Sequence, residues 1–363
     1  MKSNFKFKVV FSSLIMHVFY CVLFVSSSLA QDIHFSQVNL TPLLLNPALT
    51  GLGGDHRAIV NYKKQWSGMG KPGATYSTTL FSYDTRLLAK RSKAGFVGAG
   101  INAYKDVAGD LQLGTTQVNI SISGVVNISR KQFLSGGLQA GYVQKSISTA
   151  NMQWDSQYDE TSGTYNSGLQ SNDVVAIPPY LYGDFSAGLA YGINIKQSSV
   201  RANNQKKFNI GASAYHVNRP DQKLNPYNIK TTDKMYAKII VHSSATFGIP
   251  STNYEIIPSA VYFMQGPSTE INVGSMLRWI IKGASRYTGY VQGMALSFGA
   301  QYRVGDAVIP MVLFEYSNLS IGLCYDVNTS ALIQGTKGKG GLEVSLKYAT
   351  PNPFRKSSSR LLD

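Results

Sequence analysis

The sequence predicts a transmembrane β-barrel, on the basis of strand-like alternation, the composition of the polar strand face and an N-terminal export signal. The 363 residues are 44% hydrophobic and only 15% charged, with 34 Gly, 22 Tyr and 16 Phe. This composition excludes an intrinsically disordered chain, and two cysteines exclude a disulfide scaffold. The formal net charge of +15 leaves nucleic acid and a membrane surface open as partners until the positions of the charges are considered.

Residues 1–30 are typical of a secretory signal peptide. Three lysines precede an apolar run over residues 9–25, and Ser28-Leu29-Ala30 offers small residues for cleavage before Gln31. A membrane anchor is the alternative, but the run is shorter than the roughly 20 residues of a spanning helix. Cys21 lacks the small preceding residues of a lipidation site. Loss of three lysines from 34 basic residues leaves 31 against 19 acidic ones, a net charge of +12.

Alternation with a period of two dominates the rest of the chain. Odd-numbered residues of 185–195 are apolar, and the even-numbered ones are Ser, Gly, Ala or Asn. The same pattern recurs at 118–123, 134–142, 294–303, 319–326 and 342–348. A soluble sandwich would carry Lys and Glu on its outer face. Strands with one apolar face and one face of small and polar residues instead match a wall between lipid and a lumen. Such a sheet must close into a barrel, because hydrocarbon offers no hydrogen-bond partners for the backbone groups of a free edge. With an export signal, this predicts the outer membrane of a diderm bacterium.

Fourteen antiparallel strands are expected within a barrel spanning residues 56–349. They cover 56–66, 73–84, 94–105, 110–127, 132–147, 180–195, 206–216, 233–247, 252–265, 268–281, 292–303, 306–316, 318–328 and 340–349. Pro258 and Pro310 each predict a bend or bulge, because proline lacks the N–H of a ladder bond. Residues 31–55 form a folded non-strand segment, which either plugs the lumen or extends into the periplasm, and residues 350–363 form a periplasmic tail.

Link lengths and charge predict the orientation. If the first strand leaves the periplasm, the long links at 148–179, 217–232 and 329–339 are all extracellular, as expected for this class. The periplasmic links then contain twelve cations and no acidic residue, which equals the net charge of the mature chain. They form either solvated turns or a docking surface for periplasmic partners or anionic headgroups, for which the candidates are Arg86, Lys90, Arg91 and Lys93. Nucleic acid is excluded as a partner by this location.

The link 148–179 is the candidate binding loop for a secreted partner. Its aromatic and acidic residues Trp154, Asp155, Tyr158, Asp159 and Tyr165 suit an adaptable binding surface. Packing within the loop is the alternative reading.

No catalytic residue, metal site or cofactor is predicted. The histidines of the mature chain lie far apart without metal-ligand spacing, and Asp159-Glu160 has no partner at enzyme-like spacing. Residues 335–341 lack the Gly-Lys-Ser/Thr order of a phosphate loop and indicate an external hairpin. Cys324 faces the lumen by parity and is read as a packing residue.

Short motifs follow one another in a specific order. They are Phe35-Ser36-Gln37, Asn46-Pro47-Ala48, Gly51, Gln65-Trp66, Asp106, Gly109, His216 to Pro220, Arg303, Gly305, Asp306 and Tyr325-Asp326. Together, over almost the whole mature chain, they resemble the PorP/SprF family of outer-membrane proteins of the Bacteroidota type IX secretion system. Lys63-Lys64 and Leu323-Cys324 depart from the usual family residues and leave the subfamily open.

The resemblance implies a non-enzymatic role in secretion and cell-surface attachment of a partner protein bearing a type IX C-terminal domain, such as a gliding adhesin. Other type IX secretion or gliding motility components and outer-membrane lipid are then the expected partners. The alternative from another class is an outer-membrane channel or transporter for small hydrophobic solutes, because fourteen strands with an N-terminal plug also suit such transporters. An open lumen would favour that alternative, and a sealed one would favour secretion.

Overall fold

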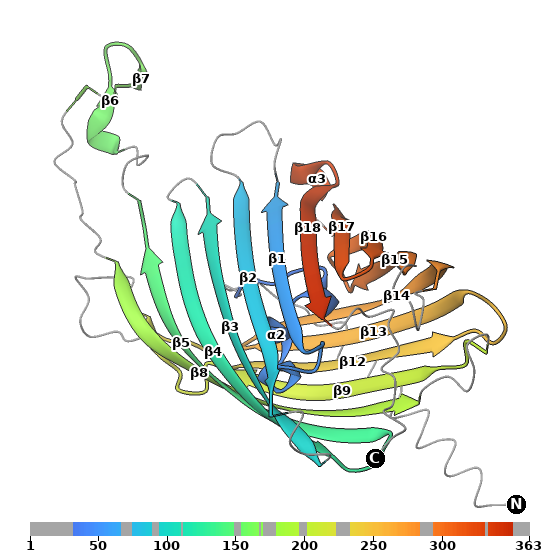
Figure 1. The fold of residues 1–363 in the computed structure, drawn as a ribbon. Helices are drawn as coiled ribbons and strands as arrows, with labels where there is room; N and C mark the ends of the chain where they lie inside the picture. Colours follow the sequence, from blue (N-terminus) through green and yellow to red (C-terminus); the bar gives the residue numbers. More distant parts are fainter. Residues whose placement is uncertain are drawn as a thin grey trace, which may run out of the picture.

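Fourteen antiparallel strands close into one barrel (Figure 1). The computed structural model describes residues 32–66, 75–88, 94–109, 112–148, 154–166, 168–169, 179–195, 202–222, 233–283, 293–330 and 333–350. The predicted fold class is confirmed. The predicted signal peptide and almost all of the predicted C-terminal tail lie outside the described residues.

The strands of the barrel follow one another around it in chain order. They are β1 (His56–Gln65), β2 (Tyr76–Leu87), β3 (Gly95–Ala108), β4 (Leu113–Asn127), β5 (Gln132–Ser146), β8 (Tyr180–Ile195), β9 (Lys206–Tyr215), β12 (Lys238–Gly248), β13 (Tyr254–Gln265), β14 (Ser268–Lys282), β15 (Met294–Arg303), β16 (Ala307–Tyr316), β17 (Leu319–Asn328) and β18 (Lys339–Thr350). The ten-residue ladder between β1 and β18 seals the barrel. The strand expected at 233–247 is shorter, because β11 (Asp233–Lys234) pairs with β10 (Asp221–Gln222) outside the wall.

The two faces of the wall differ as the alternation predicts. Leu138 on the outer face is 66% exposed, whereas its neighbour Gln139 on the inner face is 4% exposed. Ile120 and Asn119 show the same contrast, at 64% and 2%. The apolar outer face is therefore the one available to lipid, and polar side chains line the interior. Cys324 faces inward and is buried, as predicted.

The structure has no bulge at either proline, contrary to expectation. On one side, Pro258 pairs with Ser275 in an unbroken ladder. On the other side, the ladder between β12 and β13 skips two pairs and then continues in the same register. Pro310 interrupts the ladder between β16 and β17 in the same way. Each proline lacks an N–H on one side of its strand, so hydrogen bonds are lost to one neighbouring strand only. The ladder to the other neighbour is unbroken and keeps the register.

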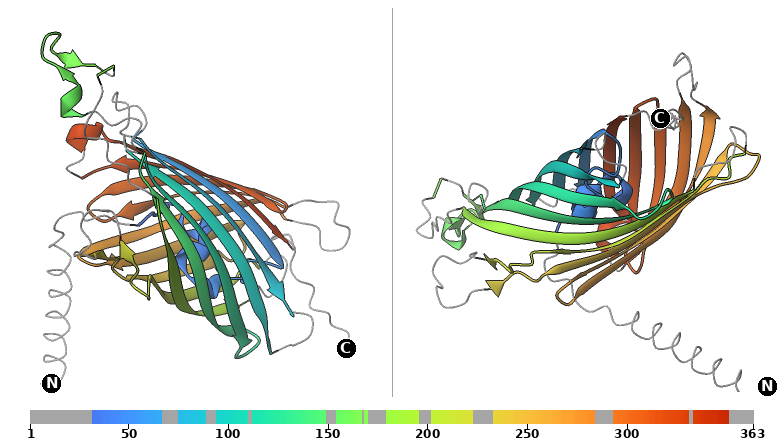
Figure 2. Two further views of the ribbon diagram at one scale, coloured as in Figure 1. Left: turned by 90° about the vertical axis from the view of Figure 1, so that its left-hand side faces the viewer. Right: turned by 60° about the horizontal axis from the view of Figure 1, so that its bottom comes forward.

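The two ends of the barrel have different links. Residues 147–179, 216–237 and 329–338 connect strands at one end, called here the long-loop end. At the opposite, short-turn end, β16 and β17 are joined by residues 317–318 alone. Inside the barrel lie three short helical turns, η1 (Val38–Leu40), α2 (Pro42–Leu45) and η2 (Pro47–Leu49), drawn in blue in Figures 1 and 2.

Candidate functional site

The candidate site is the barrel interior, where residues 32–55, called here the N-terminal segment, contact the wall from one end to the other. Asp32 meets strand ends at the long-loop end, and Asp55 leads into β1 at the short-turn end. Short turns form because Pro42 and Pro47 each open one and fix its first φ angle. The segment therefore runs through the lumen from one end to the other.

Ser36 lies in a group of buried ionic side chains, called here the Ser36 cluster, which comprises Ser36, Lys63, Arg303, Asp326 and Glu343. The Ser36 hydroxyl donates to Asp326 Oδ1 at 2.6 Å, and its backbone N–H donates to Glu343 Oε2 at 2.7 Å. Arg303 and Lys63 lie 3.2 and 3.5 Å from Asp326 Oδ2. Four strands thus hold one residue of the segment.

The charged side chains of the Ser36 cluster are buried and therefore need partners. The side chains of Lys63, Arg303 and Asp326 are 3%, 4% and 1% exposed. A buried charge is tolerated only when it is paired and hydrogen-bonded. Arg303 meets this by also contacting Asp306 at 3.0 Å, Glu270 at 3.3 Å and the Ser36 hydroxyl at 3.0 Å. The cluster fixes the beginning of the segment to the long-loop end.

A second group, the His216 cluster, holds Asp32. It comprises His216, Asp32, Asp184 and Gln265. His216 Nε2 lies 2.5 Å from Asp32 Oδ2, and Nδ1 lies 2.8 Å from Asp184 Oδ1. Burial alone would lower the pKa of His216, but the Asp32 charge and both hydrogen bonds outweigh it and raise this pKa to about 9. Burial opposes ionisation of Asp32 too, yet His216 and Lys238 keep its pKa below the ordinary value. The imidazolium therefore bridges two carboxylates.

The chain turns at His216 to reach this position. His216 has a φ of 55° and Arg219 one of 45°, so β9 ends at Tyr215. The next residues run along the free edge of β8, where Asn218 Nδ2 donates to Gly183 O and Asn218 Oδ1 accepts from Phe185 N–H. The predicted motif from His216 to Pro220 thus closes a strand edge and aims one imidazole into the lumen.

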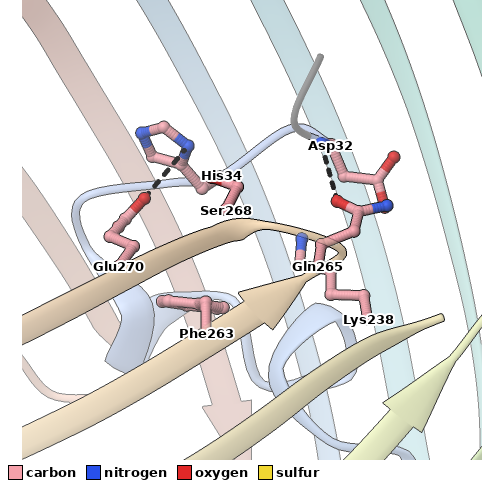
Figure 3. A pocket seen from close by; sticks show the side chains of 7 residues that line it. All are labelled: Asp32, His34, Lys238, Phe263, Gln265, Ser268 and Glu270. Carbon is pink, nitrogen blue, oxygen red and sulfur yellow. Dashed lines mark hydrogen bonds and ion pairs between the residues drawn. The ribbon is translucent and has the colours of Figure 1, made fainter. Parts of the chain in front are cut away.

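A small cavity lies beside Asp32 at the long-loop end (Figure 3). It measures about 270 Å³ and is lined by Asp32, His34, Lys238, Phe263, Gln265, Ser268 and Glu270. His34 Nδ1 is 3.7 Å from Glu270, and burial, reinforced by Lys63 and Arg303, lowers the pKa of His34. The Lys238 ammonium lies 5.5 Å from the centre of the Phe263 ring. These groups already pair with one another around the cavity.

Asn46 anchors the middle of the segment. Its Oδ1 accepts from Ala48 N–H at 2.8 Å, and its Nδ2 donates to Leu189 O at 2.9 Å. A Cβ atom at Gly188 would lie 2.0 Å from Asn46 Oδ1, and one at Gly137 would lie 2.4 Å from the backbone of Pro47. Glycines in β5 and β8 therefore provide the space for the Asn46-Pro47-Ala48 motif. Wall hydroxyls complete this contact, with Ser135 donating to Ala48 O, Ser213 to Leu45 O and Ser123 to Thr50 O.

The end of the segment is held at the short-turn end. Gly51, at a φ of 75°, donates its N–H to Asp84 Oδ2 at 2.7 Å. Arg57 donates to both carboxylate oxygens of Asp84, and Arg86 donates to Gly51 O at 2.6 Å and Leu52 O at 3.1 Å. Arg86, expected in a turn, thus lies in β2 and binds the segment. The other docking candidates, Lys90, Arg91 and Lys93, lie outside the described residues.

The remaining family-motif residues occupy strands and turns. Phe35 packs with Leu80 and Tyr104, and Gln37 N–H donates to Glu343 Oε1 at 3.0 Å. Asp106 lies in β3, not in the expected link, and accepts from Thr78 Oγ1 at 2.6 Å. Four of the remaining residues lie at or beside strand ends, with positive φ at Trp66, Gly109 and Gly305, and they are Gln65, Trp66, Gly109 and Gly305. Tyr325 lies within β17.

The candidate loop residues stand apart from the barrel. Trp154 precedes η3 (Asp155–Gln157), and β6 (Tyr158–Asp159) pairs with β7 (Thr164–Tyr165) in a small hairpin beyond the long-loop end (Figure 1). Tyr158 and Tyr165 are cross-strand partners and are 53% and 39% exposed. A hydrogen bond from Thr161 N–H, with one from Ser162, lowers the pKa of Asp159. The hairpin therefore exposes two tyrosine side chains and the ionised carboxylate of Asp159.

Sequence reasoning missed several residues that hold the segment. They are Asp184, Glu343, Arg57, Asp84, Gly137 and Gly188. For the charged residues in this list, the sequence did offer a signal. Each lies on a lumen face of otherwise small residues, and a buried charge there requires a partner.

The described residues contain no group of three or more His, Cys, Asp or Glu side chains that could hold a metal ion. Among the same residues, no helix is both long and apolar enough to cross a membrane.

Comparison with known proteins identifies the family. The family model described as type IX secretion system membrane protein PorP/SprF matches residues 27–348. No protein of curated function matches the chain.

Among solved structures, CdiB from Acinetobacter baumannii is similar at 8% identity and a TM-score of 0.37, over 81% of this chain and 60% of its own. BamA from Haemophilus ducreyi lacking POTRA domains 1–3 is similar at 9% identity and a TM-score of 0.38, over 81% and 70%. The NalP autotransporter translocator domain from Neisseria meningitidis is similar at 9% identity and a TM-score of 0.31, over 85% and 93%. The chain spans less than two thirds of the length of CdiB, and these likenesses concern the barrel fold alone. The family match over nearly the whole barrel, together with the closed sheet, means that this chain is an outer-membrane β-barrel and belongs to the PorP/SprF family of type IX secretion system membrane proteins.

Proposed function

We propose that this barrel is a non-enzymatic component that supports secretion and cell-surface attachment of a partner protein bearing a type IX C-terminal domain, such as a gliding adhesin. The long-loop end faces the cell exterior and the short-turn end faces the periplasm. Other type IX secretion or gliding motility components contact the barrel from either side, and the apolar outer face contacts outer-membrane lipid.

The observation that carries this proposal is the N-terminal segment that runs through the lumen. The N-terminal segment is hydrogen-bonded at Ser36 to β18 and at Gly51 to β2, the two neighbours of β1, and at Asn46 to β8, which lies five strands away from β1 around the barrel. A channel for small hydrophobic solutes needs a continuous path through the lumen, and the N-terminal segment lies across that path. The segment therefore favours a role in which the barrel presents surfaces to proteins.

The hairpin of β6 and β7 supplies the proposed surface for the partner. Tyr158 and Tyr165 place two exposed rings side by side, and Asp155 and Asp159 add negative charge beside them. Rigid aromatic side chains with a polar surround are typical of protein-binding surfaces. We therefore assign partner binding to Trp154, Asp155, Tyr158, Asp159 and Tyr165.

Replacement of residues 155–165 by a Gly-Ser linker tests this function. The readout is surface display, on intact cells, of a reporter fused to a type IX C-terminal domain. We expect at least about a tenfold loss of display, because removal of a hot-spot cluster costs more than 1.4 kcal/mol. Barrel assembly is followed by heat-modifiable gel mobility and should not change.

A matched control replaces residues 333–338, a second link of the long-loop end, by the same linker. Display should persist in the control. Full display after loss of the hairpin, with the barrel intact, would contradict the assignment of the partner site.

A further inference from the structure

The lumen is not filled evenly, because a cavity remains at the short-turn end. One part measures about 920 Å³ and is lined by Leu52, Phe96, Phe133, Lys207 and Asn209, among others. An adjoining part of about 640 Å³ shares Leu52, Asn209 and Ser244 with it. The lining includes residues at or near the ends of β4, β8 and β12, so the cavity lies at the short-turn end.

The wall of this cavity combines three kinds of group. Phe133 lies against Gly192, where a Cβ atom would be 2.2 Å from the Phe133 ring, and it lines the cavity. The Phe96 ring lies 4.9 Å from the Arg86 guanidinium. Asn209 Oδ1 is buried without a hydrogen-bond partner among the described residues. A buried acceptor without a donor is costly, and a ligand N–H would relieve this cost.

The charge of this end points to the kind of ligand. Among the described residues, the half of the barrel nearer the short-turn end has nine Lys and Arg residues and four acids. The four acids, Asp55, Asp84, Glu255 and Glu315, are each in an ion pair with Arg57, Arg86 or Arg278. Lys207, which lines the cavity, has no ion pair to a described acid. Two cations, Arg86 and Lys207, therefore line a cavity whose other lining residues are apolar or uncharged.

We propose that this cavity binds an extended, acidic polypeptide segment of a periplasmic partner. A backbone N–H of that segment donates to Asn209 Oδ1, an aromatic or aliphatic side chain packs between Phe133 and Leu52, and a carboxylate pairs with Lys207. The proposal adds a second protein-binding site to the proposed function and rests on it only for the orientation of the barrel.

Binding is measured on the full-length barrel in lipid nanodiscs by fluorescence anisotropy. The probe is a short synthetic peptide in which Asp and Glu alternate with Phe and Leu, compared with a counterpart in which Lys replaces each acid. We expect Lys207→Glu to weaken binding of the acidic peptide by about tenfold or more, because it turns an attraction into a repulsion. Lys206→Glu, the same change on the opposite face of β9, should alter binding by less than about twofold.

Crosslinking gives a second readout that does not depend on a charge change. In a Cys324→Ser background, a bromoacetyl form of the acidic peptide should react with Asn209→Cys and not with Ile210→Cys, its outward-facing neighbour. Equal binding of the two peptides, equal effects of Lys207→Glu and Lys206→Glu, or competition by phosphatidylglycerol vesicles without peptide crosslinking would each overturn the proposal. Surface display of the reporter is not part of this test, so its outcome is independent of the partner site at the long-loop end.

Discussion

The two halves of the barrel, each taken with its links, differ in charge. Among the described residues, the half nearer the long-loop end has ten Lys and Arg residues and twelve acids, whereas the other half has nine and four. In the first half, buried acids such as Asp326 and Glu343 bind the N-terminal segment. In the second half, a cavity remains beside Lys207. Both halves hold the N-terminal segment, since Asp84 and Arg86 bind its end, but only the short-turn half also keeps a large cavity beside a cation.

This contrast distinguishes charges that stabilise the barrel from charges that only contribute to its positive net charge. Most of the net charge does not hold the barrel together, because the stabilising ion pairs are concentrated where acids are in excess. Each of the changes below tests one side of this contrast, and stability is measured by urea unfolding of the barrel in lipid vesicles.

Arg303→Ala should give the largest effect. It leaves the buried Asp326 and the half-buried Glu270 without a main partner, and breaking a buried ionic group in this way costs about 3–5 kcal/mol. Arg219→Ala, at an exposed position of the same end, should cost less than about 0.5 kcal/mol. Similar losses for the two variants would show that the Ser36 cluster does not retain the segment.

His216→Gln should give the next largest effect, and one that depends on pH. The pKa of His216 is raised from 6.5 to about 9, so its contribution is complete below pH 6.5 and is lost as pH rises from 6.5 through 9. The shift corresponds to about 3 kcal/mol. The difference in unfolding free energy between wild type and variant should therefore be large at pH 6 and small at pH 10.

His56→Gln provides the control, because His56 is exposed and contacts the Tyr83 hydroxyl instead of buried carboxylates. A constant difference for His216→Gln across this pH range would argue against the charged bridge to Asp32.

Gly137→Ala should destabilise the barrel by about 1–3 kcal/mol, because the added Cβ would lie 2.4 Å from the backbone of Pro47 and displace the segment. Gly136→Ala is its matched control. Gly136 points outward, and an added Cβ meets only Leu189 Cδ2, at an ordinary 3.5 Å. If both variants were equally stable, the contact of the Asn46-Pro47-Ala48 motif with the wall would not matter for stability.

Lys207→Ala should give the smallest effect, below about 0.5 kcal/mol, because Lys207 has no ion pair to a described acid. A loss comparable to that of Arg303→Ala would remove the contrast between the two halves. An unchanged stability combined with weaker peptide binding would sharpen it.

The sequence predicted the wall of the barrel better than its contents. Alternation at a period of two identified all fourteen strands of the closed sheet, because lipid and lumen impose opposite demands on neighbouring residues. Strand ends were less accurate. Arg86 and Asp106 were expected in links and lie in β2 and β3, because the strands continue beyond the apolar alternation.

The interior could be predicted only in part. The motif residues Ser36, Asn46, His216 and Asp326 were recognised, but their spatial relation was not. Contacts such as that of Ser36 with Glu343 join residues 307 positions apart. The residues next to Ser36 and next to Glu343 in the sequence do not indicate that the two meet. Positions such as Gly137 have meaning only once the path of the N-terminal segment is known.

The contact between the first described residues and the last strand also has a consequence for assembly. Ser36 and Gln37 bind Glu343 on β18, and β18 is the strand that closes the sheet onto β1. The carboxylate that receives the segment is thus one of the last groups to be synthesised. Closure of the wall and capture of the segment both depend on β18, so we expect the two to occur together and late in assembly.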